Sequence, residues 1–153
     1  MQLQKVNVIA KPPAIYFISI LAGILLQIIY SLPILPFFGL RVVGLLLIGL
    51  GLGLSIWGDR EFKRHDTAVN PDQPPTILVT TGLYRFSRNP MYVGLTLLQL
   101  GLALTLNSWW LVLTLVPALI MMSRGVIDRE EQFLAAKFGK RYIDYKNSVR
   151  RWL

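Results

Sequence analysis

The chain contains no cysteine and a single histidine, His65. Without thiols there can be no disulfide and no thiolate metal ligand, and a lone imidazole cannot build a zinc site. We therefore expect no metal centre, and we expect His65 to be an ordinary loop or interface residue. Charge is also scarce, because only 16% of the 153 residues are Asp, Glu, Lys or Arg, against about a quarter in a typical soluble domain.

Apolar residues are correspondingly abundant. They make up 54% of the chain, and the mean hydropathy is +0.51. A soluble protein of this size cannot bury so much apolar surface, so part of its solvent must be lipid. We expect a single all-α, membrane-embedded domain over residues 1–153. No cleavable signal peptide is apparent, because the first apolar run is long and lacks a small-residue cleavage site.

Four apolar segments predict membrane helices approximately over residues 14–32, 42–57, 91–106 and 109–125, since a crossing takes about 20 apolar residues. Only Asn107 and Ser108 separate the last two segments, which therefore predict a tight helical hairpin. Small residues allow helices in a membrane to approach closely. We expect such an approach along the second segment, at its glycines Gly44, Gly49, Gly51 and Gly53.

The positive charges are distributed unevenly between the two ends of this helix arrangement. The net charge is +8, and all 16 Lys and Arg except Arg41 fall on the side of the N-terminus, the loop 59–90 and the tail 126–153. The positive-inside rule makes that side cytoplasmic, so we expect both termini in the cytoplasm and place the helices in the cytoplasmic membrane of a prokaryote. Anionic membrane lipids, and no nucleic acid, are the partners that we expect for this charge.

The loop 59–90 and the tail 126–153 are the candidate site-forming segments. Long loops tend to be functional, and we expect its apolar run at 76–79 to form a buried extended strand. The tail places apolar residues at helical spacing among charged ones, with Gly139 as a C-cap, which predicts an amphipathic cytoplasmic helix. Its apolar residues are Phe133, Phe138, Tyr142 and Tyr145.

Folding the hairpin brings two polar groups together at one membrane face. Asn89 and Pro90 predict a helix start, with Asn89 as N-cap and Pro90 in the first turn. Free backbone N–H groups at such a start suit a carboxylate ligand. Glu130 and Glu131 lie at the other end, and adjacent side chains on a helix point about 100° apart. One glutamate can therefore face a pocket while the other pairs with an arginine or faces water.

A ligand with a carboxylate at one end and amino or hydroxyl groups at the other would fit between this helix start and Glu130. The rings of Tyr84 and Tyr92 would lie near a cation on that ligand. S-adenosylmethionine has an amino-acid end, ribose hydroxyls, an adenine and a sulfonium charge. Taken without this context, the glutamate pair would indicate only a solvated helix face.

These residues also resemble a known family. The stretch TILVTTGLYRFSRNPMYVG at 76–94, the REE triplet at 129–131 and the segments 138–145 and 149–151 are similar to the isoprenylcysteine carboxyl methyltransferase and phospholipid methyltransferase superfamily. Its members are integral-membrane enzymes that use S-adenosylmethionine. The core pattern is Arg-His-Pro-x-Tyr followed by Glu-Glu after a helical hairpin. Asn89 stands at the histidine position, where it can form hydrogen bonds but cannot titrate near neutral pH.

The resemblance implies a cofactor pocket and its residues. The backbone of four residues would line it: Thr76, Ile77, Leu78 and Val79. Five residues would close over the cofactor: Tyr84, Asn89, Pro90, Met91 and Tyr92. Glu130 and Glu131 would supply the anchoring carboxylate. The family also implies an arginine that engages a substrate carboxylate, and Arg124 is the candidate for this catalytic role.

We therefore expect an integral-membrane methyltransferase that passes a methyl group from S-adenosylmethionine to a lipophilic acceptor, with S-adenosylhomocysteine as the second product. The acceptor is a prenylcysteine-like carboxylate or a lipid. Methyl transfer needs alignment and exclusion of water, and the lack of an evident base favours a carboxylate over an amine. The alternative is a non-catalytic membrane scaffold or small-ligand carrier that keeps the fold. Asn89, at the histidine position of the family pattern, favours this alternative.

Overall fold

The computed structural model describes residues 8–35, 38–65, 67 and 75–153. Within these ranges the chain forms helices and no strand, which confirms the all-α prediction. The extended strand predicted at 76–79 does not form, because none of the described residues offers it a neighbouring strand and Thr76 and Ile77 are exposed. Backbone groups without a ladder partner bond to side chains or water instead, and the Thr76 N–H donates to Thr67 Oγ1 at 2.9 Å.

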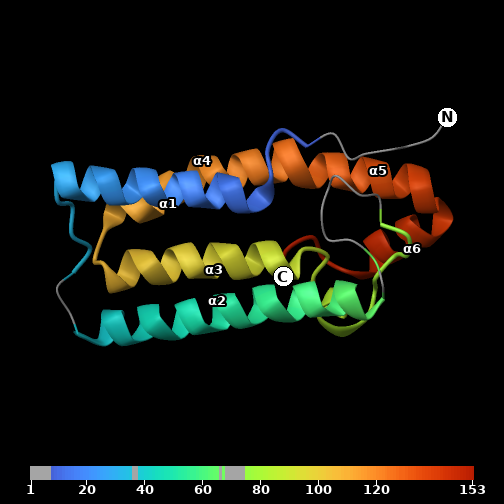
Figure 1. Cartoon of the computed structure of the whole chain (residues 1–153), viewed down its shortest axis with the longest axis horizontal. Coiled ribbons are helices and arrows are strands. Elements are labelled where there is room, and N and C mark those ends of the chain that lie inside the picture. The colour runs from blue at the N-terminus through green and yellow to red at the C-terminus, as the bar shows by residue number, and fades with distance from the viewer. Residues whose placement is uncertain (1–7, 36–37, 66, 68–74) are drawn as a thin grey trace.

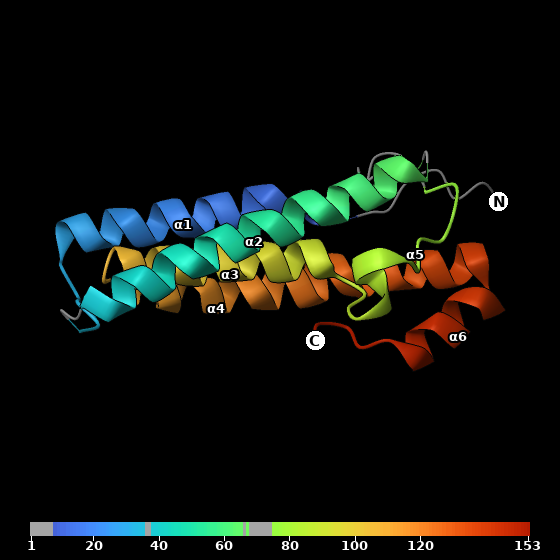
Figure 2. The same cartoon turned by 90° about the horizontal axis from the view of Figure 1, so that it is seen from below.

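Four apolar helices run side by side in the described part of the chain (Figure 1). They are α1 (Pro12–Ile29), α2 (Phe38–Arg64), α3 (Pro90–Thr105) and α4 (Trp109–Ile120). A π-helical segment, Met121–Ile127, joins α4 to α5 (Asp128–Phe138), and Gly139 ends α5 as predicted before α6 (Lys140–Ser148). Figure 2 shows α5 and α6 beyond one end of the bundle, and we call this end, with the described residues of 59–90, the polar end.

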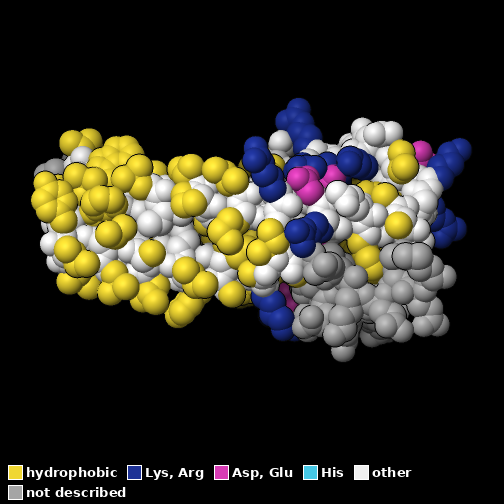
Figure 3. All heavy atoms as spheres, turned by 90° about the horizontal axis from the view of Figure 1, so that it is seen from above, with side chains coloured by type: hydrophobic (Ala, Val, Ile, Leu, Met, Phe, Trp, Pro, Cys, Tyr) yellow, Lys and Arg dark blue, Asp and Glu magenta, His cyan; other side chains and the backbone are white. Residues whose placement is uncertain are grey.

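The helices have the dimensions of membrane spans. By length and composition, α1, α2 and the continuous helix Trp109–Phe138 could each cross a membrane, and α3 is a shorter apolar helix. Apolar side chains cover the bundle, whereas Lys, Arg, Asp and Glu gather at the polar end (Figure 3). The chain is therefore an all-α integral membrane protein.

The helix α2 extends further than the predicted segment 42–57. Residues 59–64, which were expected to begin the loop, continue the helix to Arg64. Lys63 pairs with Asp59 one turn earlier, and the cations Lys63 and Arg64 in the last turn suit the negative end of the helix dipole. Of the remaining loop, residues 66 and 68–74 lie outside the described ranges.

Glycines let the backbones of α2 and α3 touch. A Cβ atom on Gly51 would lie 2.5 Å from the carbonyl oxygen of Gly94, and one on Gly101 would lie 2.6 Å from that of Gly44. The predicted close approach is thus confirmed at Gly44 and Gly51. It is wrong at Gly49 and Gly53, which face open space. Positions seven apart return to one helix face, whereas positions two apart lie on nearly opposite faces.

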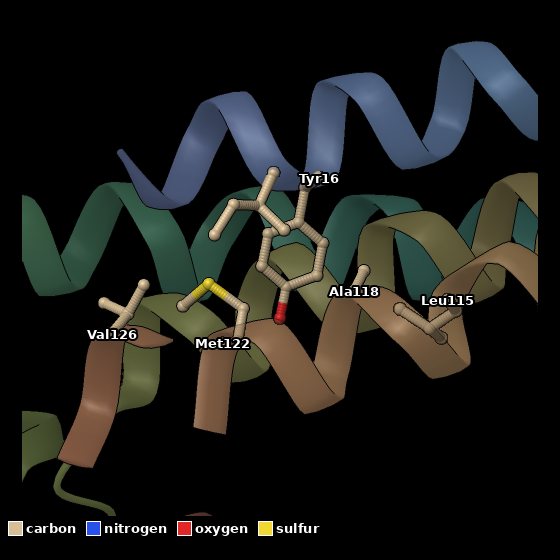
Figure 4. Close-up of a cluster of buried hydrophobic side chains, with 6 residues drawn as sticks. Tyr16, Leu115, Ala118, Met122 and Val126 are labelled. Carbon is tan, nitrogen blue, oxygen red and sulfur yellow. The ribbon is translucent and has the colours of Figure 1, made fainter. Parts of the chain in front are cut away.

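The helix α1 packs on α4 around Tyr16, which is almost fully buried near Ala118 and Met122 (Figure 4). Its hydroxyl forms a hydrogen bond of 2.8 Å with Thr96 Oγ1 on α3. One turn further on, Gln99 Nε2 donates to Ser19 Oγ at 2.7 Å and to the Leu111 carbonyl at 3.1 Å. Hydrogen bonds of this kind hold helices together in lipid, where apolar surface provides little drive for association.

The hairpin turn between α3 and α4 forms as predicted. Asn107 adopts a left-handed backbone with φ of 51°, which asparagine tolerates better than most residues. Its Oδ1 accepts from the N–H groups of Ile34 and Leu35, both at 2.9 Å. Trp110 Nε1 donates to the Tyr30 carbonyl at 2.7 Å. The turn is thereby fastened to the connection that follows α1.

The glycine contacts predict that Gly51→Ala destabilises the protein and that Gly49→Ala does not. Each substitution adds one methyl group to α2 and changes helix propensity equally. A methyl group at 51 would meet the α3 backbone, whereas nothing lies within 4 Å of one at 49. Overpacking of this kind costs about 1–3 kcal/mol. Thermal unfolding in detergent should give a lower midpoint for Gly51→Ala, and equal midpoints would contradict the contact.

Candidate functional site

The first turn of α3 and the start of α5 meet at the polar end. Tyr92 on α3 donates its hydroxyl hydrogen to Glu130 Oε1 on α5 at 2.8 Å. Pro117 lies inside α4, and the π-helical segment begins four residues later, at Met121. Each π turn adds a residue to the helical repeat and so turns the following side chains to another face. The structure thus brings together Tyr92 and Glu130, which are 38 residues apart in the chain.

The Glu130 carboxyl has an unusual environment. It lies beyond the first 20 or so residues of the helix that begins at Trp109, and so beyond the stretch that a bilayer spans. The side chain is half-buried. Burial raises its pKa from 4.5 to about 7, and the hydrogen bond from Tyr92 only partly offsets this effect. Near neutral pH this carboxyl can therefore exchange a proton, and a cationic ligand group would favour its ionised form.

The neighbouring Glu131 is held by three cations. Arg151 binds it in a bidentate manner, with Nε 2.8 Å from Oε1 and Nη2 2.9 Å from Oε2. Arg88 Nη1 lies 3.1 Å from Oε1, and Lys146 Nζ lies 2.8 Å from Oε2. Burial alone would raise the pKa of Glu131, but the hydrogen bonds from Lys146 and Arg151 and the charge of Arg88 outweigh it and lower the pKa. This carboxyl therefore stays ionised.

The hydroxyl of Tyr84 is buried without a hydrogen-bond partner among the described residues. Tyr84 lies in the short 3-10 helix Gly82–Arg85, with its ring edge-on to Phe62 at 5.2 Å. A Cβ atom on Gly58 would lie 3.5 Å from this hydroxyl. Burial raises the Tyr84 pKa, and the nearby carboxylates of Glu130 and Glu61 raise it further, so the phenol stays a neutral donor. An unpartnered buried donor is costly, and a ligand acceptor would remove that cost.

Glu61 belongs to this region and was missed by the sequence analysis. It is only 5% exposed and accepts from Thr81 Oγ1 at 2.6 Å. Gly82 lies directly over it with φ of +57°, and a Cβ atom there would be 2.8 Å from the Glu61 carboxyl carbon. The signal was its spacing: Glu61 follows Gly58 by three residues and so shares the α2 face that Gly51 presents to α3. The run of charges around Glu61 had suggested a loop instead.

Asn89 precedes α3 as predicted, but its side chain does not cap the helix. Its Nδ2 donates to the Arg151 carbonyl at 2.9 Å. Its backbone, with ψ of 52°, lies outside the extended conformation from which an N-cap side chain reaches the first turn. The Asn89 side chain thus bonds to the C-terminal residues and not to the first turn of α3. The neighbouring Arg88 N–H donates to the Arg150 carbonyl at 2.9 Å.

Three of the predicted lining residues surround a pocket. Thr76, Ile77 and Leu78 line a cavity of about 470 Å³, which they share with Thr80, Phe138, Arg141 and Asp144. Pockets for small ligands have volumes of about 300–1,000 Å³. Val79, the fourth predicted residue, is buried and is not part of this lining. The predicted loop segment therefore borders a space that a small molecule can occupy.

The remaining predicted residues lie at different depths. Pro90 is buried in the first turn of α3, and Met91 packs against Gly58 of α2. Arg124 is exposed in the π-helical segment. No hydrogen bond or ion pair of its guanidinium occurs within the part of the chain that the structure describes. The substrate-binding role of Arg124 stays a prediction.

The contrasting glutamates predict how stability depends on pH. Between pH 4.5 and about 7 the folded protein holds a proton on Glu130 that the unfolded chain releases. Stability should therefore fall as the pH rises through this window and should level off above the folded pKa. Glu131, with a lowered pKa, contributes stability that is present above its ordinary pKa and is lost in acid.

Thermal unfolding of the wild type and of Glu130→Gln, followed between about pH 5 and pH 8, measures this effect. The decline of stability with rising pH should disappear in the variant, because the amide does not titrate. A decline of the same size in both proteins would assign it to another group.

Comparison with known proteins supports the resemblance seen in the sequence. A family model described as phospholipid methyltransferase matches residues 40–141. The chain is 37% identical over 76 residues to protein-S-isoprenylcysteine O-methyltransferase of Saccharomyces cerevisiae and 35% identical over 75 residues to that of Schizosaccharomyces pombe. Each match covers 48% of this chain, but only 30% and 31% of the respective yeast proteins.

An uncharacterized protein of Haemophilus influenzae is 38% identical over 63 residues, which are 41% of this chain and the whole of that protein. No solved structure matches the chain significantly. The family model spans the glycine contacts of α2 and α3, the Tyr84 turn and both glutamates. The chain therefore belongs to the phospholipid methyltransferase family.

Proposed function

We propose that the protein is a membrane methyltransferase that uses S-adenosylmethionine to methylate a lipophilic acceptor. The observation that carries this proposal is that a half-buried carboxyl with a raised pKa, Glu130, and a buried hydroxyl without a partner among the described residues, Tyr84, both lie at the polar end of a membrane bundle, close enough for the Glu130 charge to act on Tyr84. Family membership and the names of the two yeast relatives support the reaction class. A scaffold without such a ligand would leave the buried Tyr84 hydroxyl unsatisfied.

The residues present fit the cofactor's chemistry. Glu130 offers a carboxylate to an amino group, and Tyr84 offers a neutral donor to a hydroxyl or carboxylate. The pocket beside Thr76 and Phe138 has both apolar and polar walls, which suits an adenosyl group. When bound, S-adenosylmethionine supplies an electrophilic methyl group on its sulfonium. Tyr92 fixes the orientation of the Glu130 carboxylate through its hydrogen bond.

The acceptor is proposed to be lipophilic because the site lies at the end of a membrane bundle. A prenylcysteine-like carboxylate or a lipid can keep its apolar part in the bilayer while its reactive group enters the polar end. A carboxylate is already ionised and needs no base for attack on the methyl carbon. Arg124, whose side chain is exposed in the π-helical segment, is proposed to engage such a carboxylate.

The proposal predicts that Glu130→Gln weakens binding of S-adenosylhomocysteine about 10- to 150-fold, which corresponds to about 1.5–3 kcal/mol for one charge-assisted hydrogen bond. Titration calorimetry measures the affinity. Calorimetry in two buffers of different ionisation enthalpy should also show that the wild type releases a proton near neutral pH, because a bound amine requires the ionised carboxylate. The variant should release none.

Lys63→Gln is the matched control, since it removes an exposed charge from the same end of the molecule. If Glu130→Gln binds as tightly as the wild type, Glu130 is not in the site. Methyl transfer is then assayed with labelled cofactor and a lipid extract. Tight binding without any transfer would favour the non-catalytic alternative.

We further propose that the polar end faces the cytoplasm. This orientation follows from the clustering of positive charge there, and it would place the cofactor site where S-adenosylmethionine is available. The protein has no native cysteine, so a thiol reagent labels only the cysteine that is introduced. Ser31→Cys and Asn147→Cys lie at exposed positions at opposite ends of the bundle.

Applied to spheroplasts, a membrane-impermeant thiol reagent should label Ser31→Cys from outside. It should label Asn147→Cys only after the membrane is opened. Labelling of both variants from the same side would contradict the orientation.

A further inference from the structure

We propose that Glu131 is a positioning residue that does not touch the cofactor. It holds the C-terminal strap, defined here as residues 149–153, against the start of α3. By doing so it fixes the geometry of Tyr92 and Glu130. This inference rests on the proposed function, because the site whose geometry it controls is the cofactor site at Glu130. It separates the roles of two glutamates that the sequence had assigned to the same ligand.

The Glu131 carboxylate has no acceptor position left for a ligand. Oε1 contacts Arg151 Nε and Arg88 Nη1, and Oε2 contacts Arg151 Nη2 and Lys146 Nζ. A carboxylate offers about four lone-pair sites, and these four contacts use them. The cofactor's amino group would also meet three cations here. Within the ranges that the structure describes, Glu130 carries none of these ion pairs and has a single hydrogen bond, from Tyr92.

The strap connects Glu131 to the helix that carries Tyr92. The backbone of Arg88 donates to the Arg150 carbonyl, and the side chain of Asn89 donates to the Arg151 carbonyl, both at 2.9 Å. Asn89 directly precedes Pro90, with which α3 begins. Figure 1 shows the C-terminus beside the start of α3. The contacts therefore form a closed ring from α5 through the strap to α3, and through Tyr92 back to α5.

Burial makes this ring stiff. The side chain of Arg88 is 10% exposed and that of Glu131 is 8% exposed. Removing one partner of a buried ion pair leaves the other charge without compensation, which costs far more than losing a surface pair. Loss of the Glu131 charge should therefore force Arg88 and the strap to move, and Tyr92 and Glu130 would lose their fixed separation. Misplacement by about 1 Å can lower function about a hundredfold.

Two single variants and their combination test this role. Glu131→Gln and Arg151→Ala should each weaken binding of S-adenosylhomocysteine about 10- to 100-fold. The double variant should be no weaker than the worse single one, because both substitutions release the same strap. Arg151→Lys keeps the charge and should be milder than Arg151→Ala. Lys63→Gln, which breaks an exposed ion pair, should bind like the wild type.

Hydrogen exchange at the Arg88 amide supplies a readout that does not depend on activity. This amide donates to the Arg150 carbonyl, so its protection should fall in Glu131→Gln while amides of the α2–α3 contact keep theirs. A wild type that does not bind S-adenosylhomocysteine would refute the proposed function, and the exchange result would still test the strap.

Two outcomes would overturn the inference. If Glu131→Gln loses affinity while the Arg88 amide stays protected, Glu131 contacts the ligand itself. If protection is lost while affinity is unchanged, the strap positions nothing in the site.

Discussion

The contact between the backbones of α2 and α3 is the constraint on which the site depends. Gly44 meets Gly101 and Gly51 meets Gly94, and Gly58 continues the same face by another seven residues. At Gly58 the facing groups are no longer glycines but Met91 and the Tyr84 hydroxyl. This row of glycine contacts between α2 and α3, which we call the glycine seam, therefore ends at the candidate site.

The two adjacent glutamates show how one helix start can serve two purposes. A helix separates neighbouring side chains by about 100°, so Glu130 faces α3 while Glu131 faces the strap. Burial without a cation leaves the Glu130 pKa near 7, and ion pairs hold the Glu131 pKa low. The pKa values of the two carboxyls are thus shifted in opposite ways because the side chains point in different directions. The π-helical segment before α5 sets that direction.

Local sequence patterns predicted the features that depend on local physics. The hairpin at Asn107, the start of α3 at Pro90 and the end of α5 at Gly139 each follow from the preference of one or two residues. The meeting of Tyr92 with Glu130 followed from the hairpin, because a hairpin of two similar helices must bring its ends together. The resemblance to a family added the loop that we propose to face the ligand.

Features that depend on a distant partner could not be predicted. The sequence around Asn89 predicts an N-cap. In the structure its side chain instead donates to the strap, at a residue 62 positions away in the chain. Gly49 and Gly51 are indistinguishable until the position of α3 selects one face of α2. Glu61 was hidden because its spacing from Gly58 indicates burial only once the α2 face that packs on α3 is known. Each of these outcomes is set by packing between elements, which periodicity within one element does not record.

Unsatisfied polar groups help to separate the scaffold from the site. Among the described residues, buried polar atoms without a partner occur both inside the bundle, at Gln99 and Thr105, and at the polar end, at Tyr84 and Arg88. Gln99 still makes three hydrogen bonds through its nitrogen, so its cost is partial. The Tyr84 hydroxyl makes none, and a carboxyl with a displaced pKa lies close enough to shift its titration. A folded protein tolerates such a combination where a ligand compensates it, and this is the physical ground for our proposal that the cofactor binds where the glycine contacts of α2 and α3 end.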